Sequence, residues 1–314
     1  MADPPTPSQL MPFRHVVDAR QFTREWLDEV LFPRAADLQA RPASLSQALH
    51  GKRLFYLLYE PSTRTRVSFE MAASLLGASV TGMDAFEHRP EDERLEDRIR
   101  VLNQYPYDFL LLRYHEEGGA SRAAAVSHVP VINAGDGHGQ HPTQALLDAY
   151  TLWREFGRID GLRIALVGDL SYERSTNSLA YLLSQYREMR FYLVSPQLLD
   201  MRAEVREHLI GSGAQVEQAR DLRSVASEVD VVYVTRAQTP RLEHARRFEA
   251  SAGSYTVDRE VLSMLPRDGR VMHPLPRGPE LPPEVDDDPR VVCFTQAGNG
   301  LYVRMALLCL LAGD

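Results

Sequence analysis

Lysine and cysteine are almost absent from this sequence. Lys52 is the only lysine among the 35 basic residues of the 314-residue chain, so nearly every positive charge is an arginine, which stays protonated in a protein. Chemistry that needs a titratable ammonium group therefore has a single candidate. The two cysteines, Cys293 and Cys309, are too few for a disulfide framework and lack zinc-ligand spacing. We expect both to be buried, and we expect no metal site.

Long apolar runs and an excess of positive charge are also missing. The longest apolar stretches, such as 305–311, are far shorter than the roughly 20 residues that span a bilayer, so we expect no membrane partner. Because the first residues show no signal-peptide pattern, we expect a cytoplasmic protein. A formal net charge of -8 argues against nucleic acid as a main partner.

Short apolar runs alternate with amphipathic stretches along most of the chain. Such runs are typical of parallel strands buried on both faces, and the stretches between them have helical spacing. The pattern predicts an α/β fold with two doubly wound parallel-sheet domains joined by long helices. The expected strands are 53–59, 109–112, 129–133, 163–167, 191–194, 229–234, 270–272 and 291–294. The expected helices include 70–76, 95–104, 143–156, 177–185 and 300–311.

The strand pattern restarts after a turn at 157–161, which places the domain junction in the preceding helix. The predicted first domain is 1–145, completed by a C-terminal helix at 295–314, and the predicted second domain is 146–294. A chain of 314 residues is long enough for two domains of ordinary size.

A hydroxyl-rich turn, S-T-R-T-R at 62–66, follows the first expected strand and opens a helix. Such a turn directs free backbone N–H groups, hydroxyls and the helix dipole at one point, as a phosphate site requires. Arg64 and Arg66 lie two residues apart, so we expect one to face the anion and the other to form a structural ion pair. An ordinary helix cap with surface arginines is the alternative interpretation.

Four further motifs follow other expected strands, at 133–144, 167–177, 233–241 and 273–277. In open parallel sheets, ligands bind beyond the carboxyl ends of the strands, so these motifs predict a ligand-binding region. His141 and Gln144 fall on the first turn of a helix after a glycine-rich loop, where both side chains are able to approach one ligand. A purely structural histidine is the alternative for His141.

The motifs resemble those of the aspartate carbamoyltransferase catalytic chain in order and spacing, over nearly the whole sequence. They are S-T-R-T-R, H-P-T-Q, G-D-L-x-Y-x-R, T-R-x-Q, H-P-L-P-R and, at 296–300, Q-A-G-N-G. The resemblance implies transfer of the carbamoyl group from carbamoyl phosphate to L-aspartate in pyrimidine biosynthesis, without metal or organic cofactor. The H-P-L-P motif favours aspartate over ornithine, because ornithine carbamoyltransferases typically carry a Cys-Leu-Pro pattern there.

The resemblance also assigns roles to individual residues. Those implied to hold the phosphate are Ser62, Thr63, Arg64, Thr65 and Arg113. His141, together with Thr65 and Arg113, is implied to polarise the carbamoyl carbonyl and to stabilise its oxyanion. The implied catalytic set is therefore Arg64, Thr65, Arg113 and His141.

Two further groups complete the implied site. The carbamoyl amide is implied to be read by Gln144 and by the backbone carbonyls of the turn Pro274-Leu275-Pro276, with Leu275 and Pro276 as the named ligands. The two carboxylates of aspartate are implied to be bound by Arg174, Arg236 and Gln238.

The segment 84–98 departs from the family pattern. Family members carry a serine and an essential lysine in this mobile loop, and alignment on the flanking residues places Glu87 and Glu91 at those positions. Arg89 or Arg94 is one possible substitute for the lysine. Two other interpretations are a catalytically impaired paralogue that acts as a scaffold and a carbamoyltransferase for a different amine acceptor.

The resemblance finally implies an assembly. Family members form a homotrimer in which neighbouring subunits share active sites, so we expect a homotrimer here. A regulatory or dihydroorotase partner is a further expectation from the family.

Overall fold

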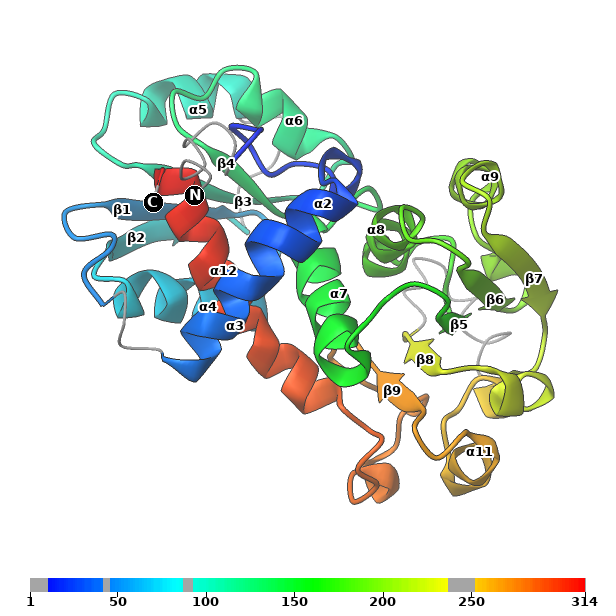
Figure 1. The fold of residues 1–314 in the computed structure, drawn as a ribbon. Helices are drawn as coiled ribbons and strands as arrows, with labels where there is room; N and C mark the ends of the chain where they lie inside the picture. Colours follow the sequence, from blue (N-terminus) through cyan, green and yellow to red (C-terminus); the bar gives the residue numbers. More distant parts are fainter. Residues whose placement is uncertain (1–10, 42–45, 87–92, 237–251, 314) are drawn as a thin grey trace. The chain divides into compact units, whose positions relative to one another are not determined.

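The computed structural model describes residues 11–41, 46–86, 93–236 and 252–313, and every structural statement below concerns these residues. The chain separates into two compact units. The first unit comprises Met1–Tyr150 with Gly298–Asp314, and the second comprises Thr151–Ala297. Each unit contains one parallel sheet flanked by helices, as the alternating sequence pattern predicted (Figure 1).

The sheet of the first unit has four parallel strands in the order β2-β1-β3-β4. Its strands are β1 (Arg53–Leu58), β2 (Ser79–Asp84), β3 (Phe109–Tyr114) and β4 (Val131–Asp136). The helices of this unit are α2 (Arg24–Trp26), α3 (Phe32–Ala40), α4 (Thr63–Leu75), α5 (Leu95–Leu102) and α6 (Gly119–Ala124). A π-helical turn, η2 (Leu27–Leu31), joins α2 to α3.

One core of the first unit lies between the sheet and the pair α5 and α6, which cover the same face (Figure 1). Helix α5 buries Leu95, Ile99 and Leu102, which recur at helical spacing and therefore share one face. They join Leu57 of β1 and Leu112 of β3 in one buried cluster. Complete burial of each such side chain contributes about 1.5–3 kcal/mol, so this apolar stripe fixes α5 against the sheet.

The sheet of the second unit has five parallel strands in the order β7-β6-β5-β8-β9. They are β5 (Arg163–Val167), β6 (Arg190–Val194), β7 (Gln215–Ala219), β8 (Val231–Val234) and β9 (Arg270–Met272). Its helices include α8 (Arg174–Leu183), α9 (Ala203–Gly211) and α11 (Arg259–Met264). Two longer helices, α7 (Pro142–Phe156) and α12 (Cys293–Ala312), each have residues in both units.

The core of the second unit is formed around the central strands of its sheet. Val167, Val232 and Val234 lie in one buried cluster with side chains from the segments that flank the sheet, such as Leu222 and Val261. After Arg163, strand β5 is apolar, and β8 is apolar along its length, because each has a neighbouring strand on both sides and is covered above and below.

One predicted strand is wrong, and two observed strands were not predicted. The run 291–294 forms a single bridge between Val291 and Val271, and helix α12 already begins at Cys293. A four-residue apolar run does not distinguish a strand from the first turn of a buried helix. Strands β2 and β7 carry polar and exposed residues, and each lies at one edge of its sheet, where such residues are tolerated.

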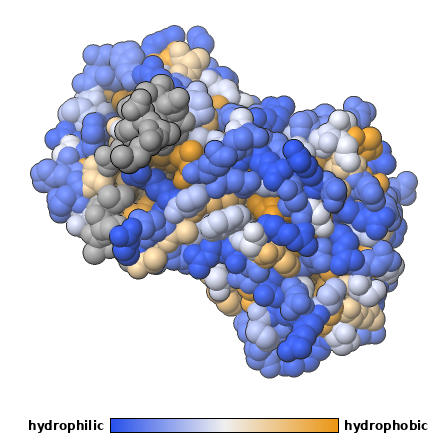
Figure 2. All heavy atoms as spheres, in the orientation of Figure 1, coloured by the Kyte–Doolittle hydropathy of each residue, from blue (hydrophilic) through white to orange (hydrophobic). Residues whose placement is uncertain are grey.

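Both cysteines are buried and free, as expected. Of the helices that the structure describes, none is both long enough and apolar enough to cross a membrane. The face shown in Figure 2 is mainly hydrophilic, and its apolar residues form small separate patches.

Candidate active site

Three neighbouring strand ends of the first unit carry predicted site residues. The S-T-R-T-R turn follows β1 and opens α4, with Ser62 as the residue that precedes the helix. Arg113 lies on β3 beside the end of β1, and the glycine-rich loop begins on β4. Arg113 Nη1 lies 3.3 Å from Ser62 Oγ and donates to the carbonyl oxygen of Ala134 at 3.0 Å. One guanidinium therefore joins the ends of β1, β3 and β4.

Glu60 is a partner of Arg113 that the sequence analysis did not single out. Its Oε2 accepts a hydrogen bond from Arg113 Nε at 3.1 Å. The carboxylate holds the guanidinium in place and offsets part of its charge. Glu60 stands two residues before the S-T-R-T-R motif, and this closeness of a carboxylate to a predicted anion site is the one sequence feature that would have drawn attention to it.

The two arginines of the motif have different surroundings. Arg66 forms ion pairs with Glu70 at 3.0 Å and with Asp84 at 2.6 Å, which confirms that one arginine has a structural role. Arg64 is exposed on the first turn of α4, and Thr65 on the same turn is buried. Its position on the first turn of the helix keeps Arg64 as the candidate anion ligand of this motif.

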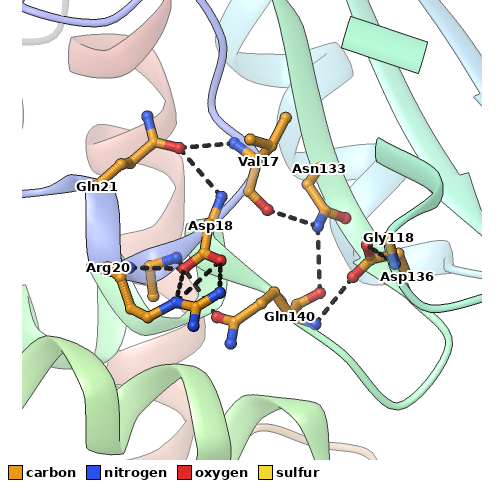
Figure 3. Close-up of polar contacts among 9 residues, drawn as sticks. Val17, Asp18, Arg20, Gln21, Gly118, Asn133, Asp136 and Gln140 are labelled. Carbon is orange, nitrogen blue, oxygen red and sulfur yellow. Dashed lines mark hydrogen bonds and ion pairs between the residues drawn. The ribbon is translucent and has the colours of Figure 1, made fainter. Parts of the chain in front are cut away.

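The loop that leads to His141 is held by its own polar side chains (Figure 3). The two carboxylate oxygens of Asp136 accept hydrogen bonds from the N–H groups of Gly118, at 2.9 Å, and Gln140, at 2.8 Å. Asn133 Nδ2 donates to the carbonyl oxygens of Val17, at 3.0 Å, and Gln140, at 3.4 Å. These hydrogen bonds fix the shape of the loop, and the loop in turn sets the position of His141 at the start of α7.

The N-terminal segment is hydrogen-bonded to the same loop (Figure 3). Gln21 Oε1 accepts hydrogen bonds from the N–H groups of Val17 and Asp18, at 2.9 and 3.0 Å. Together, Asp18 and Gln21 form a capping box around the short helix η1 (Ala19–Gln21). The N–H of Ala19 then donates to Gln140 Oε1 at 3.4 Å, which links this cap to the loop.

His141 and Gln144 lie at the start of α7. His141 is buried, and its Nδ1 lies 3.4 Å from Thr143 Oγ1. Gln144 Nε2 donates a hydrogen bond to Asp148 Oδ1 at 2.9 Å, one turn further along the helix. Asp148 is buried and was not predicted as part of the site.

A buried arginine on α12 supports this arrangement. Arg304 Nη1 donates to Ser68 Oγ on α4, and Ser68 Oγ donates in turn to the carbonyl oxygen of Arg64 at 2.7 Å. Burial lowers the pKa of Arg304 to about 10, and the nearby negative charge of Asp148 acts in the opposite direction. Gly300 makes room for this side chain, because a Cβ there would lie 2.8 Å from Arg304 Nη1.

The motifs of the second unit follow β5, β8 and β9, which are neighbours in its sheet. Thr235, just after β8, donates its N–H to the carbonyl oxygen of Val167 at 2.9 Å. Gly168 has a φ of 115°, and a Cβ there would lie only 2.3 Å from the carbonyl oxygen of Thr235. Only glycine fits this close approach, so Gly168 lets the loop after β5 meet the loop after β8.

Arg174 and Arg236 occupy these two loops. Arg174 is the first residue of α8 and is buried, whereas Arg236 is exposed just after β8. The carboxylate of Glu173 caps α8 by accepting the N–H of Ser175 at 3.1 Å. Gln238, the third residue predicted to bind aspartate, lies outside the described residues.

Buried side chains form hydrogen bonds across the turn after β9. The N–H of Leu275 donates to His273 Nδ1 at 2.8 Å, and His273 Nε2 lies 2.9 Å from Glu280 Oε1. The same carboxylate oxygen accepts the N–H of Gly278 at 2.6 Å. Burial acts to raise the pKa of Glu280, but the hydrogen bonds from His273 and Gly278 outweigh it, so this pKa lies below its ordinary value.

The atypical loop is only partly described. Glu87, Arg89 and Glu91 lie outside the described residues. Arg94 directly precedes α5, and its side chain is 73% exposed with Glu96 Oε2 at 3.8 Å from its Nε. Across residues 11–41, 46–86, 93–236 and 252–313, no cluster of His, Cys, Asp and Glu is arranged to hold a metal ion.

Comparison with known proteins gives matches over most of the chain. The profile of the aspartate/ornithine carbamoyltransferase carbamoyl-P binding domain matches residues 14–154, and that of the Asp/Orn binding domain matches residues 160–311. The chloroplastic aspartate carbamoyltransferase of Oryza sativa is 47% identical over 94% of this chain and 84% of its own length. The aspartate carbamoyltransferase catalytic subunit of Thermococcus onnurineus is 44% identical over 96% of this chain and 97% of its own.

Solved structures agree with these matches. Trypanosoma cruzi aspartate transcarbamoylase in complex with carbamoyl phosphate superposes with a TM-score of 0.88 at 34% identity, over 94% of this chain and 95% of that one. The same enzyme in complex with N-(phosphonacetyl)-L-aspartic acid also gives a TM-score of 0.88 over the same shares. The catalytic subunit of M. jannaschii aspartate transcarbamoylase gives 0.87 at 39% identity, over 95% of this chain and 98% of that one.

Proposed function

This chain belongs to the aspartate/ornithine carbamoyltransferase family, and from that membership we propose that it is an aspartate carbamoyltransferase. Its reaction transfers the carbamoyl group of carbamoyl phosphate to the amino group of L-aspartate, and yields N-carbamoyl-L-aspartate and phosphate. The relatives named as aspartate carbamoyltransferases favour this activity over a scaffold role or another acceptor. The activity belongs to pyrimidine biosynthesis.

The observation that carries this proposal is the arrangement of Arg113 and Ser62 at the start of α4. A guanidinium, a hydroxyl and the N-terminus of a helix that has no side-chain cap hydrogen bond lie at the exposed side chain of Arg64. This combination suits a phosphate group, because all of its members are hydrogen-bond donors or positive dipoles. The proposed phosphate ligands are Ser62, Thr63, Arg64, Thr65 and Arg113.

The chemistry follows from positioning and electrostatics. The aspartate amine attacks the carbamoyl carbon, the bond from that carbon to the phosphate oxygen breaks, and the leaving phosphate takes up the proton of the amine. His141, Thr65 and Arg113 stabilise the negative charge that develops on the carbonyl oxygen, a contribution that commonly amounts to about 3 kcal/mol per donor. Gln144 and the carbonyls at Leu275 and Pro276 read the amide.

Aspartate binding is assigned to the loops after β5 and β8. Arg174 and Arg236 provide two guanidinium groups for the two carboxylates, and Gln238 provides an amide. The close approach of Gly168 to Thr235, which brings these loops together, supports the assignment. The role of the lysine that family members carry in the loop is assigned to Arg94, which directly precedes α5 and has an exposed side chain. Arg89 is the second candidate.

The homotrimer is likewise proposed, with active sites shared between copies. Val67 and Met71 lie one turn apart on α4 and are 48% and 50% exposed, and Phe86 after the neighbouring strand β2 is 46% exposed. Contact with a second copy would cover these apolar side chains. Light scattering of the purified protein tests this, since a monomer would contradict it. A regulatory or dihydroorotase partner and a cytoplasmic location stay predictions.

The activity is tested by incubating the purified protein with carbamoyl phosphate and L-aspartate. We expect N-carbamoyl-L-aspartate and phosphate in equal amounts, and no carbamoylated product when ornithine replaces aspartate. Absence of turnover with aspartate, together with turnover of another amine, would contradict the proposed acceptor.

The phosphate site is tested with two arginine variants of the same helix. Arg64→Ala should weaken binding of inorganic phosphate by about 10- to 100-fold, because it removes a charged hydrogen-bond donor. Arg66→Ala is the matched control, since Arg66 is held by Glu70 and Asp84, and should bind phosphate within about twofold of the parent protein. Equal affinity in both variants would rule out Arg64 as the ligand.

A further inference from the structure

The turn after β9 holds its backbone in a conformation that leucine rarely adopts. Leu275 has a φ of 56°, in the left-handed region, and is followed by a cis bond to Pro276. Any residue with a Cβ atom disfavours this φ, so the surrounding structure must hold Leu275 in place. The side chain of Leu275 also packs against the core of the second unit.

His273 holds this residue through a defined tautomer. A backbone N–H is only a donor, so the bond from Leu275 requires His273 Nδ1 to be the unprotonated acceptor. The ring proton then lies on Nε2, which donates to Glu280.

Two further side chains fix the ends of the turn. The N–H of His273 donates to Gln296 Oε1 at 2.9 Å, which ties the start of the turn to α12. Glu280 accepts hydrogen bonds from Nε2 of His273, at the start of the turn, and from the N–H of Gly278, at its end, so it links the two ends. Leu275 and Pro276 lie between these anchors.

We propose that His273 and Glu280 are positioning residues for recognition of the carbamoyl amide. They touch no reacting atom; they aim the carbonyl groups of the turn so that these accept hydrogen bonds from the carbamoyl NH2. The inference deepens the proposed function and rests on its assignment of Leu275 and Pro276 to the amide.

Stability alone is a poor explanation for this pair. His273 and Glu280 are both buried, and burying an imidazole and a carboxylate usually gains little over apolar side chains of similar size. Their hydrogen bonds end on the backbone N–H groups of Leu275 and Gly278, on either side of the proposed carbonyls. The pair is therefore placed to control the shape of the turn.

The test compares two small phosphonates that differ only in the group to be read. Phosphonoacetamide carries an amide, and acetonylphosphonate carries a methyl group in place of the NH2. Calorimetry gives the dissociation constants of both, and their ratio reports amide recognition independently of phosphate binding and of turnover. The parent protein should prefer the amide by about tenfold, the typical value of one or two net hydrogen bonds.

Three variants separate a positioning role from a structural one. His273→Ala should bring the ratio close to one while inorganic phosphate binds as before. His273→Asn should recover most of the preference, because its side-chain oxygen is able to accept the N–H of Leu275. Glu280→Gln should prefer the amide less than the parent protein and more than His273→Ala. If His273→Ala does not fold, the comparison of Glu280→Gln with His273→Asn tests the inference instead.

Asp230→Asn is the matched control. Asp230 also accepts a backbone N–H and a side-chain N–H, both from Arg163, but it lies at the opposite ends of the strands, before β8. This variant should lose stability and keep the amide preference. A folded His273→Ala protein that keeps the preference overturns the inference and leaves the proposed function intact. A parent protein without any preference overturns the amide assignment itself.

Discussion

The side-chain amide of Gln144 donates to the carboxylate of Asp148, over 2.9 Å and one turn along α7. A carboxylate only accepts hydrogen bonds, so it must face the NH2 group of Gln144. The oxygen of Gln144 is thereby left as the outward acceptor, which is the polarity that a carbamoyl NH2 requires. Asp148 thus determines how Gln144 presents itself to the proposed substrate.

Asp148→Asn should remove this control of orientation. Asparagine is able to donate as well as accept, so Gln144 is free to turn over, and we expect the KM for carbamoyl phosphate to rise about fivefold or more. The buried charge of Arg304 also loses its counterpart, which should cost about 3 kcal/mol of unfolding free energy. Steady-state kinetics and urea denaturation measure the two effects. Asp37→Asn, on α3, is the control, and a KM as low as that of the control would refute the role of Asp148.

Arg94→Ala tests the assignment of the loop charge. If Arg94 replaces the lysine of the family, its removal should lower kcat by about 10- to 100-fold with aspartate and carbamoyl phosphate at saturation. Arg100→Ala is the matched control, because Arg100 lies on α5, the helix that directly follows Arg94, and pairs with Asp97 on the surface. Loss of activity in Arg89→Ala alone would move the assignment to Arg89.

Glu173→Ala should improve aspartate binding and reduce stability. The carboxylate of Glu173 caps α8 directly beside Arg174, so it places a negative charge where an aspartate carboxylate is proposed to bind. Its removal should lower the KM for aspartate by about threefold and cost about 1 kcal/mol for the lost cap. Asp221→Ala removes a comparable cap in the same unit, at η5 (Leu222–Ser224), and should leave the KM unchanged. A KM that rises in Glu173→Ala would indicate that Glu173 helps to bind the acceptor.

Glu96 should make the stability of the protein dependent on acidic pH. The hydrogen bond from Arg122 lowers the pKa of Glu96 to about 2 from its ordinary value of 4.5. Because the folded pKa lies below the unfolded one, the pair stabilises the fold above about pH 4.5 and loses its effect as the pH falls towards about 2. The difference in unfolding free energy between the parent and Glu96→Gln should therefore shrink over this range. A difference that stays constant from neutral to acidic pH would contradict the prediction.

The central strands were predictable because buried parallel strands must be apolar throughout. Strand β5 has the bounds expected from the sequence, 163–167, and β6 (Arg190–Val194) begins one residue before the expected run 191–194. The edge strands β2 and β7 were not predictable in this way, because one side of each has no neighbouring strand and polar residues are tolerated there. The run 291–294 shows the reverse error, since burial alone does not distinguish a strand from a helix start.

The sequence by itself determined which strand ends carry chemical groups, because the motifs follow the apolar runs along the chain. Only the tertiary structure decided which groups support them. Glu60 and Arg113 are 53 residues apart, and Ser68 and Arg304 are 236 apart, yet each pair is hydrogen-bonded. Buried charges require partners, and the choice among many carboxylates and hydroxyls depends on which elements the fold brings together. No local pattern contains that information.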